Sequence, residues 1–494
     1  MVERAGKKFR TEEDTLGSIK VPAEAYWGAQ TERALENFPE SGAKFPPVFF
    51  RALAYIKLAC ARVNAELGLL ERKKARAIIR ASKEVLADRL RAQFPVDIFQ
   101  TGSGTSTNMN VNEVIATRAN EMLTGAKSTR HPVHPNDHVN MGQSSNDVIP
   151  SAIHISCLLL AREKLLPALA GLEKKLREKS ALYKDVVKTG RTHLMDAMPV
   201  TLGQEMSGWA AQTGHLVEEA NSALPALRRL AMGGTAVGTG ANAHPEFGRR
   251  VADALSRLTG LDLKEAENHF MAQASQDAVL ALSGRLKTAA SAFIKISTDL
   301  RLMNSGPDCG IGEIRLRAVQ PGSSIMPGKV NPVMPEAVRM IGAQVIGNGV
   351  AIAMGDAMGE FELNAMLPVI ARNVLESMTL IANAALLLQK SIDGLEVNAE
   401  RMREALEKNA MTGTALSPVI GYDRAAEVIK NARAGKKTIR ETVVEMGYMG
   451  EKEARRLLDP EAMTRPKKKK TPESIEAHKA ADPGLRTRKG SHIP

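Results

Sequence analysis

The chain contains, at residues 322–336, the stretch Gly-Ser-Ser-Ile-Met-Pro-Gly-Lys-Val-Asn-Pro-Val-Met-Pro-Glu. Its prolines and glycines predict a loop between helices. Gly322 can take backbone angles closed to other residues, and two serines follow it directly. Lys329 and Asn331 add a cation and an amide a short step from these hydroxyls. A fixed positive charge, neutral donors and a flexible backbone suit a small anion; the alternative interpretation is a turn-rich surface loop.

Length and composition favour a helical protein of several domains. The chain has 494 residues, too many for one ordinary core, which suggests about three domains. Aromatic residues make up only 4% of the chain, so Leu, Ala, Val, Ile and Met must fill the core. This composition favours packed helices over β-sandwiches, which prefer aromatic and β-branched residues. The sequence contains no run of about 18 consecutive apolar residues, so it predicts no membrane span. The charged segment 1–14 does not resemble a secretory signal.

The cysteines bear on cofactors and on the cellular compartment. There are three of them, Cys60, Cys157 and Cys309, and they lie far apart in the sequence. Their spacing indicates neither a disulfide framework nor a zinc or iron–sulfur site. We therefore expect a cytoplasmic protein without a zinc or iron–sulfur centre.

The net charge of +12 is unevenly distributed. Residues 464–494 hold nine Lys and Arg against three Asp and Glu, a balance of +6. This tail is also poor in large apolar residues, which predicts a disordered, solubilising segment, with binding to a polyanion as the alternative. The remaining +6 is modest for the body of the chain and is compatible with dianionic substrates, so we do not expect nucleic acid as a partner.

Helical periodicity appears after an extended, partly stranded segment at residues 11–45. Residues 48–92 place apolar side chains at helical spacing, which predicts helices. Between residues 94 and 150 polar and small residues dominate, which predicts a loop-rich region that carries a site.

Three long segments, 246–306, 336–367 and 369–417, lack proline and so permit long helices. Along the first, apolar residues from Leu282 to Leu300 recur every three or four positions without strict heptads, which favours a helix bundle over a coiled coil. The predicted divisions are an N-terminal domain at 1–142, a central helical bundle at 143–399, a small helical C-terminal domain at 400–463 and the basic tail at 464–494.

The stretch at 322–336 resembles the signature of the fumarase/aspartase superfamily, whose members eliminate a group from a fumarate-yielding substrate. Five other blocks are similar to the family's motifs, in the family's order, and the likeness runs from about residue 11 to about residue 462. These blocks are Thr101-Gly-Ser-Gly-Thr-Ser-Thr-Asn-Met-Asn110, His134-Pro-Asn-Asp-His-Val-Asn140, Gln143-Ser-Ser-Asn-Asp147, Gly190-Arg-Thr-His-Leu-Met-Asp196 and Gly233-Gly-Thr-Ala-Val-Gly-Thr-Gly240.

Removal of water from a hydroxy-dicarboxylate needs a base for a carbon-bound proton, an acid for the leaving hydroxide and clamps for the carboxylates. The resemblance implies that Ser323 is the base, with Lys329 and the Gly322 loop stabilising its alkoxide. It also implies that Glu336 orients and polarises the imidazole of His193.

The clamps are implied by the same resemblance. Neutral donors hold charge without cancelling it, which matters when charge must grow in the transition state. For the hydroxyls at 103–105 and 144–145, helix capping or turn chemistry is the structural alternative. The implied substrate-binding residues are Ser103, Thr105, Ser144, Ser145, Asn146, Thr192, Ser324, Lys329 and Asn331.

A second anion site is implied at His134, Asn136 and Asp137, because these residues resemble a secondary dicarboxylate site of fumarases. The alternative is a structural turn, since Asn-Asp after proline is favourable turn chemistry.

Several positions resemble the class II fumarases rather than the aspartate ammonia-lyases. Ser103 stands where the ammonia-lyases carry alanine, Thr192-His193 replaces their Thr-Gln, His134 replaces their Asn, and Gly328 is the fumarase choice before the lysine. Asp308 departs from the family, in which many relatives carry arginine there. The resemblance implies reversible anti-hydration of fumarate to (S)-malate without a metal or an organic cofactor. The alternatives are an ammonia-lyase and a nucleic-acid-binding or structural protein built on a retired enzyme scaffold.

The resemblance also implies the architecture. We expect a mainly α, three-domain fumarase/aspartase-like fold, in which the central helices of four subunits form a twenty-helix core. The implied partners are fumarate and malate and three further copies of the chain, with active sites shared between subunits.

Overall fold

The computed structural model describes residues 8–38 and 40–466. Beyond residue 466, the predicted disordered tail lies outside the described residues. The chain forms two compact units, which are considered one at a time. Unit 1 comprises residues up to Glu178 together with Ser207–Glu396, and unit 2 comprises Lys179–Met206 together with the chain from Val397 onward.

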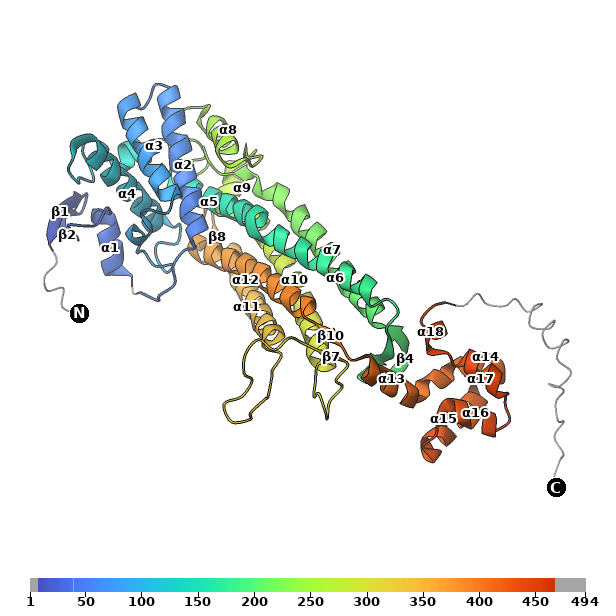
Figure 1. Ribbon diagram of the computed structural model, residues 1–494. Helices are drawn as coiled ribbons and strands as arrows, with labels where there is room; N and C mark the ends of the chain where they lie inside the picture. Colours follow the sequence, from blue (N-terminus) through green and yellow to red (C-terminus); the bar gives the residue numbers. More distant parts are fainter. Residues whose placement is uncertain (1–7, 39, 467–494) are drawn as a thin grey trace. The chain divides into compact units, whose positions relative to one another are not determined.

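Unit 1 begins with a strand hairpin followed by helices (Figure 1). Strands β1 (Phe9–Asp14) and β2 (Gly17–Pro22) pair antiparallel, as the extended segment at 11–45 predicts. Buried Glu113 fixes the next helix, because its carboxylate accepts hydrogen bonds from the N–H groups of Gly28, Gln30 and Thr31 at 2.9 to 3.1 Å. The helices that follow are α1 (Ala29–Asn37), α2 (Pro47–Glu66), α3 (Arg72–Leu86) and α4 (Thr105–Thr124).

Helix α4 corrects one prediction. Residues 94–150 were expected to be rich in loops, yet a 20-residue helix runs through them. Its buried side chains include many polar ones, so hydrophobic periodicity could not reveal it. These buried polar residues are Ser106, Thr107, Asn108, Asn110, Asn112, Glu113, Thr117 and Asn120.

The long helices predicted from proline-free segments are confirmed. They are α10 (Asp277–Met303), α11 (Val333–Ala357) and α12 (Leu367–Asp393), which pack against one another. On α10 the predicted apolar face is buried throughout, from Leu282 to Leu300. Helix α5 (Ser145–Leu160) continues through a π-helical turn into α6 (Leu166–Leu182) and lies beside this bundle with α7 (Leu202–Leu227) (Figure 1).

Shorter elements complete the part of the chain up to residue 397. They are β5 (Arg229–Leu230), α8 (Phe247–Thr259), β6 (Lys264–Glu265), α9 (His269–Ala274), β7 (Ile314–Arg315), β8 (Gly359–Glu360), β9 (Leu363–Asn364) and β10 (Glu396–Val397).

Unit 2 joins two segments that are far apart in sequence. The antiparallel strands β3 (Val187–Thr192) and β4 (Met195–Thr201) lie against the C-terminal helices, and Asn409 Nδ2 donates to the carbonyl of Ala197 at 2.8 Å. The predicted C-terminal domain at 400–463 thus groups with residues 179–206, whereas the boundary at 142 falls inside unit 1. The division into three domains stays a prediction. The helices are α13 (Ala399–Lys408), α14 (Ser417–Ile420), α15 (Tyr422–Gly435), α16 (Ile439–Glu445), α17 (Glu451–Leu457) and α18 (Pro460–Met463).

Helix α11 has an unusual outer face. Among the described helices it is the one long and apolar enough to cross a membrane by length and composition, and only 33% of its most apolar window is buried. Met340, Ala343, Gly347, Val350 and Met354 recur every three or four residues on its exposed side. Such a stripe is weak support for a membrane span, because a helix that packs against another protein surface has the same composition.

Candidate active site

The signature loop is closed at its neck by two hydrogen bonds. The N–H of Gly322 donates to the carbonyl of Lys329 at 2.7 Å, and Asn331 Nδ2 donates to the carbonyl of Gly322 at 2.7 Å. A Cβ atom at position 322 would lie 2.6 Å from the Lys329 carbonyl oxygen. Only glycine therefore fits this neck without a backbone shift, and Gly328 supplies a second special position with φ of 81°.

Ser323 sits inside this loop under two backbone donors. Its Oγ accepts hydrogen bonds from the N–H groups of Ile325 and Met326, at 3.2 and 3.0 Å. Donors aimed at a hydroxyl oxygen favour its deprotonated form, which is what a serine base requires. Ser324 and Lys329 are exposed on the same loop, so they can reach a ligand that the loop covers.

Glu336 lies in the first turn of α11, close to the end of the signature loop. One of its carboxylate oxygens is 3.9 Å from an Arg301 Nη2 atom. The carboxylate is half-buried and its ion pair with Arg301 is long, so it remains able to accept a further hydrogen bond.

His193 occupies the tip of the β3–β4 hairpin in unit 2. The two-residue turn between Thr192 and Met195 consists of His193 and Leu194, whose φ angles are 55° and 63°. Turns of this kind normally use Asn-Gly, because other side chains are strained at positive φ. The exposed imidazole is thus held in an unfavourable backbone conformation, which is common at functional sites.

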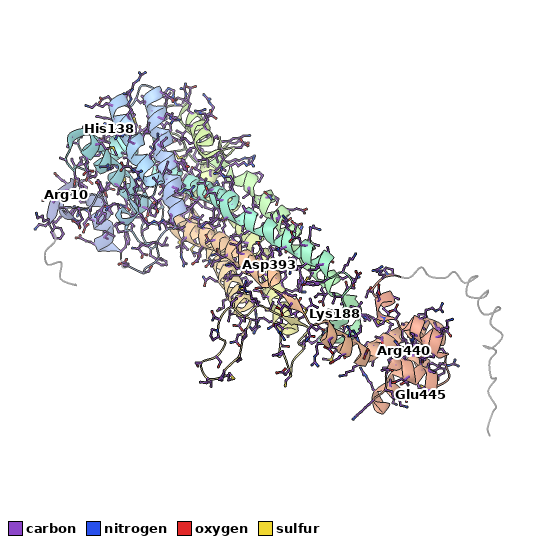
Figure 2. All side chains as sticks on the ribbon, viewed as in Figure 1. Arg10, His138, Lys188, Asp393, Arg440 and Glu445 are labelled. Atoms are coloured by element: carbon purple, nitrogen blue, oxygen red, sulfur yellow. The ribbon has the colours of Figure 1, made fainter. Side chains whose placement is uncertain are left out.

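The base of the same hairpin is anchored by an ion pair between the buried Lys188, which Figure 2 labels, and the partly exposed Glu205. Lys188 on β3 is 2% exposed, and its Nζ lies 2.8 Å from a carboxylate oxygen of Glu205 on α7. Pairing with a carboxylate is the usual way in which a buried ammonium is tolerated. The anchor fixes the strands that carry Thr192 and His193.

The predicted hydroxyl clamps lie at the N-termini of two helices. Ser103 Oγ and Thr105 Oγ1 are 2.8 Å apart where α4 begins. Ser144 caps α5, accepting from the N–H of Asn146 at 3.2 Å, while Asp147 accepts from the N–H of Ser144 at 2.9 Å. Capping is therefore a role that Ser144 does fulfil. A helix N-terminus also favours anions, so capping and clamping are compatible there.

These two helix starts lie side by side. Asn108 Nδ2 on α4 donates to Ser145 Oγ on α5 at 3.0 Å, and a Cβ at Gly104 would contact Ile149. Asn146 Nδ2 is used differently, since it donates to the carbonyl of Ala236 at 2.7 Å. The structure thus brings the clamps Ser103, Thr105, Ser144, Ser145 and Asn146 into one cluster.

Buried Asp147 supports this cluster from below. Its Oδ2 accepts from the N–H groups of Gly233 and Thr235 at 3.3 and 3.0 Å, which ties the block at 233–240 to α5. Burial raises the pKa of Asp147 to about 7, against the opposing effect of these hydrogen bonds.

The signature loop and the clamp cluster lie at opposite ends of α11. The N–H of Leu367, where α12 begins, donates to the carbonyl of Gly102 at 3.0 Å, and that end of α12 lies against Gly355 near the end of α11. The loop joins the other end of α11. With 25 residues in α11, the two ends are about 37 Å apart. Within one chain, the structure does not bring Ser323 to Ser103.

At the second predicted site, His134 acts in a turn. Its Nδ1 accepts from the N–H groups of Asn136 and Asp137, both at 3.2 Å, and Arg130 Nε approaches its Nε2 at 3.2 Å. Burial lowers the pKa of His134. The turn alternative has structural support, while anion binding at these residues stays a prediction.

Comparison with known proteins identifies the family of the chain. A family model described as Lyase matches residues 17–347, and a model described as Fumarase C C-terminus matches residues 414–465. The class II fumarate hydratase of Xylella fastidiosa (strain Temecula1) is 51% identical over 458 residues, covering 92% of this chain and 96% of the relative. That of Nitrosomonas europaea is also 51% identical, over 92% of this chain and 99% of the relative. The chain belongs to the class II fumarate hydratase family.

A solved structure of the family has the same fold. The crystal structure of the class II fumarase from Schistosoma mansoni superposes with a TM-score of 0.90 at 40% identity, covering 93% of this chain and 100% of that chain. The predicted mainly α, fumarase/aspartase-like fold of the chain is thereby confirmed, and the chain is a hydro-lyase; the twenty-helix core of four subunits stays a prediction.

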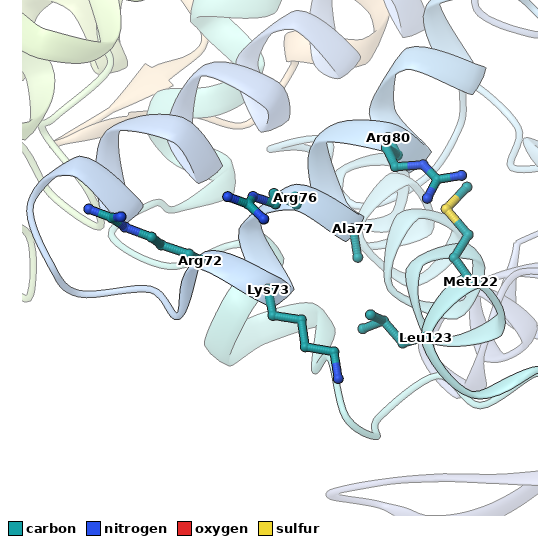
Figure 3. A pocket seen from close by; sticks show the side chains of 7 residues that line it. All are labelled: Arg72, Lys73, Arg76, Ala77, Arg80, Met122 and Leu123. Carbon is teal, nitrogen blue, oxygen red and sulfur yellow. The ribbon is translucent and has the colours of Figure 1, made fainter.

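A surface hollow lies between α3 and the end of α4 (Figure 3). Its volume is about 450 Å³, and none of the predicted site residues lines it. Arg72, Lys73, Arg76 and Arg80 point along one side, and Met122 and Leu123 of α4 form the other.

Sequence reasoning missed the buried groups beneath the clamps, above all Lys57 and Asn140. A signal existed for Lys57, because it is a lone charge inside the apolar run Ala52–Ala61 of a predicted helix. Asn140 gave no such signal, since its partners come from two helices, α2 and α4, that are distant from it in the sequence.

Proposed function

We propose that this chain catalyses the reversible anti-addition of water to fumarate, giving (S)-malate, in the cytoplasm. The observation that carries this proposal is Ser323, whose hydroxyl oxygen receives two backbone N–H groups inside a closed loop that also presents Lys329. A family of fumarate hydratases and a serine prepared for deprotonation point to the same chemistry.

In the direction of malate dehydration, Ser323 removes the proton from the carbon beside one carboxylate. The electron pair moves onto that carboxylate, where Lys329 and Asn331 stabilise the added charge. The C–O bond then breaks, and His193, polarised by Glu336, gives a proton to the leaving hydroxide. The products are fumarate and water. Ser323 then releases its proton to solvent and His193 takes up a proton from solvent, which restores both groups.

The second carboxylate belongs to the hydroxyl cluster. Ser103, Thr105 and the Ser144–Asn146 segment offer donors at two adjacent helix N-termini, where an anion is favoured. Thr192 and Ser324 complete the proposed set from the hairpin and from the loop. No step requires a metal ion or an organic cofactor.

The proposed active enzyme is a homotetramer with shared sites. The separation of about 37 Å along α11 supports this, because Ser323 of one chain can meet Ser103 only if it comes from another chain. The exposed apolar stripe on α11, from Met340 to Met354, suits helix packing between subunits in a multi-chain core.

The test compares malate and aspartate as substrates for the purified chain. Fumarate formed from either is followed by its ultraviolet absorbance. We expect rapid fumarate formation from (S)-malate and none above background from aspartate. Turnover of aspartate but not of malate would make the chain an ammonia-lyase, and turnover of neither would overturn the proposal.

A further inference from the structure

Lys57 is a fully buried lysine without a carboxylate partner. It lies on α2 with 0% exposure, and its Nζ donates to Asn140 Oδ1 and to Gln143 Oε1, both at 2.9 Å. No described carboxylate lies within ion-pair distance of this nitrogen. Burying an ammonium in this way costs free energy that an apolar side chain of similar volume would not. A purely structural position in an apolar helix face would be better filled by methionine or leucine.

Asn140 and Gln143, which accept the two hydrogen bonds from Lys57, lie just before the proposed substrate-binding residues Ser144–Asn146 in the chain. Asn140 Oδ1 also receives Asn112 Nδ2 at 3.1 Å and Asn108 Nδ2 at 3.3 Å. Asn140 Nδ2 donates to the carbonyl of Gln143, and Gln143 Nε2 donates to the carbonyl of Val139. Lys57 therefore ties α2 to a turn whose next residue is Ser144.

The same network reaches the clamp directly. Asn108 Nδ2 donates to both Asn140 Oδ1 and Ser145 Oγ, so one amide links the turn to a proposed substrate ligand. Ser145 is itself buried, which leaves its hydroxyl little freedom to adjust. A shift of Asn140 would pass through Asn108 to Ser145.

Electrostatics agree with a role based on hydrogen bonding. Burial lowers the pKa of Lys57 to about 7, partly offset by the nearby Cys60 and Asp147. Both the ammonium and the neutral amine carry enough N–H groups for two bonds, so the contacts to Asn140 and Gln143 survive in either form.

We propose that Lys57 is a positioning residue that holds Ser144, Ser145 and Asn146 in the geometry that binds a substrate carboxylate. This assignment rests on the proposed function, because it concerns the same clamp. Lys57 touches no reacting atom; it acts through Asn140, Gln143 and Asn108.

The test is Lys57→Met, which keeps the side-chain length and removes the donors. Succinate, a dicarboxylate without the hydroxyl, serves as the probe, and its Kd is measured by calorimetry. We expect the Kd of succinate and the KM for malate to rise at least tenfold, while kcat falls less than fivefold. A merely structural role would instead lower the active fraction, and so the apparent kcat, with Kd and KM unchanged.

Cys60→Ala is the matched control. Cys60 is also fully buried on α2, one turn from Lys57, but it makes no side-chain hydrogen bond in this network. We expect Cys60→Ala to lower the melting temperature and to leave the Kd of succinate within twofold. A folded Lys57→Met protein with a wild-type Kd and KM would overturn the proposal.

A second variant covers the case in which Lys57→Met does not fold. Gln143→Leu keeps the amine and removes one of its two acceptors, so the Kd of succinate should rise at least threefold; an unchanged Kd in this variant would also reject the assignment. Succinate binding needs no turnover, so a wild-type chain that binds succinate but does not dehydrate malate would refute the proposed function alone.

Discussion

Asn331 and Gly322 are joined by a hydrogen bond from the side-chain amide to the backbone carbonyl, 2.7 Å long and nine residues apart in the chain. With the bond from the Gly322 N–H to the Lys329 carbonyl, it makes the signature loop a closed ring. Ser323 and Lys329 lie on that ring, so the relative position of the serine hydroxyl and the lysine ammonium depends on the two hydrogen bonds at the neck.

The first prediction tests the neck without touching a substrate donor. Gly322→Ala places a Cβ atom 2.6 Å from the Lys329 carbonyl oxygen, which the backbone can relieve only by opening the ring. We expect kcat/KM for malate to fall roughly 10²-fold, as displacements of about 1 Å at catalytic groups do. Gly328→Ala is the control for strain alone, since nothing lies within 4 Å of its Cβ position although φ is positive. Equal losses in the two variants would show that the neck has no special part.

The second prediction concerns the base and the acid. Ser323→Ala and His193→Asn should each lower kcat by roughly 10² to 10⁴, the scale of lost acid–base catalysis. The Kd of succinate should stay near the wild-type value, because the clamps remain in place. If steady-state kinetics gave wild-type kcat for either variant, that residue would have no catalytic role.

Much of the fold could be predicted because apolar periodicity controls it. The face from Leu282 to Leu300 on α10 is buried as expected, since each of those side chains gains by leaving water. Helix α4 was not predicted because it has no apolar stripe. Its buried polar residues, such as Asn108 and Asn120, are stabilised by hydrogen bonds instead.

The candidate site likewise has parts that the local sequence predicts and parts that only the folded chain reveals. Local chemistry pointed to the loop at 322–336 and to Ser144 as a cap or clamp, and both depend on neighbouring residues only. The link from Lys57 through Asn140 to Ser145, and the length of α11 between Ser323 and Ser103, are properties of the folded chain that no spacing in the sequence encodes.

The third prediction concerns backbone strain at the hairpin tip. Leu194 has φ of 63°, a conformation that costs a non-glycine residue roughly 1–2 kcal/mol. Leu194→Gly should therefore raise the free energy of unfolding by about 1 kcal/mol in denaturant titrations. Met195→Gly is the neighbouring control: Met195 is as exposed but lies in a strand, so glycine there should destabilise by roughly 0.5–1 kcal/mol. Destabilisation by both variants would mean that the turn is unstrained.

The fourth prediction is a pH dependence of stability. His154 is buried on α5, its Nδ1–H donates to the carbonyl of Arg229 at 2.9 Å, and burial lowers its pKa to about 4. The unfolded chain, with a histidine pKa near 6.5, binds more protons than the folded chain between about pH 6.5 and 4. The contribution of His154 to the free energy of unfolding is therefore fully present above about pH 6.5 and is lost as the pH falls from about 6.5 to 4.

The measurement compares wild type with His154→Gln at two pH values. The difference in unfolding free energy between them should change by about 2 kcal/mol from pH 7.5 to pH 5. The wild type loses more stability, because Gln does not titrate. Other titrating groups, such as Asp147, are common to both proteins and cancel in the comparison. Parallel pH profiles would show that the pKa of His154 is the same in the folded and the unfolded chain.

The last prediction concerns the sharing of active sites. An inactive His193→Asn protein and an inactive Ser323→Ala protein are unfolded together, refolded together and assayed with malate. If each site takes His193 and Ser323 from different chains, mixed tetramers contain some sites with both native residues, and part of the activity returns. Each variant refolded alone is the control and should stay inactive. The separation of about 37 Å along α11 supports such sharing for the loop and the clamps. No recovery, despite mixed tetramers proven by mass spectrometry, would mean that one chain supplies both residues to a site.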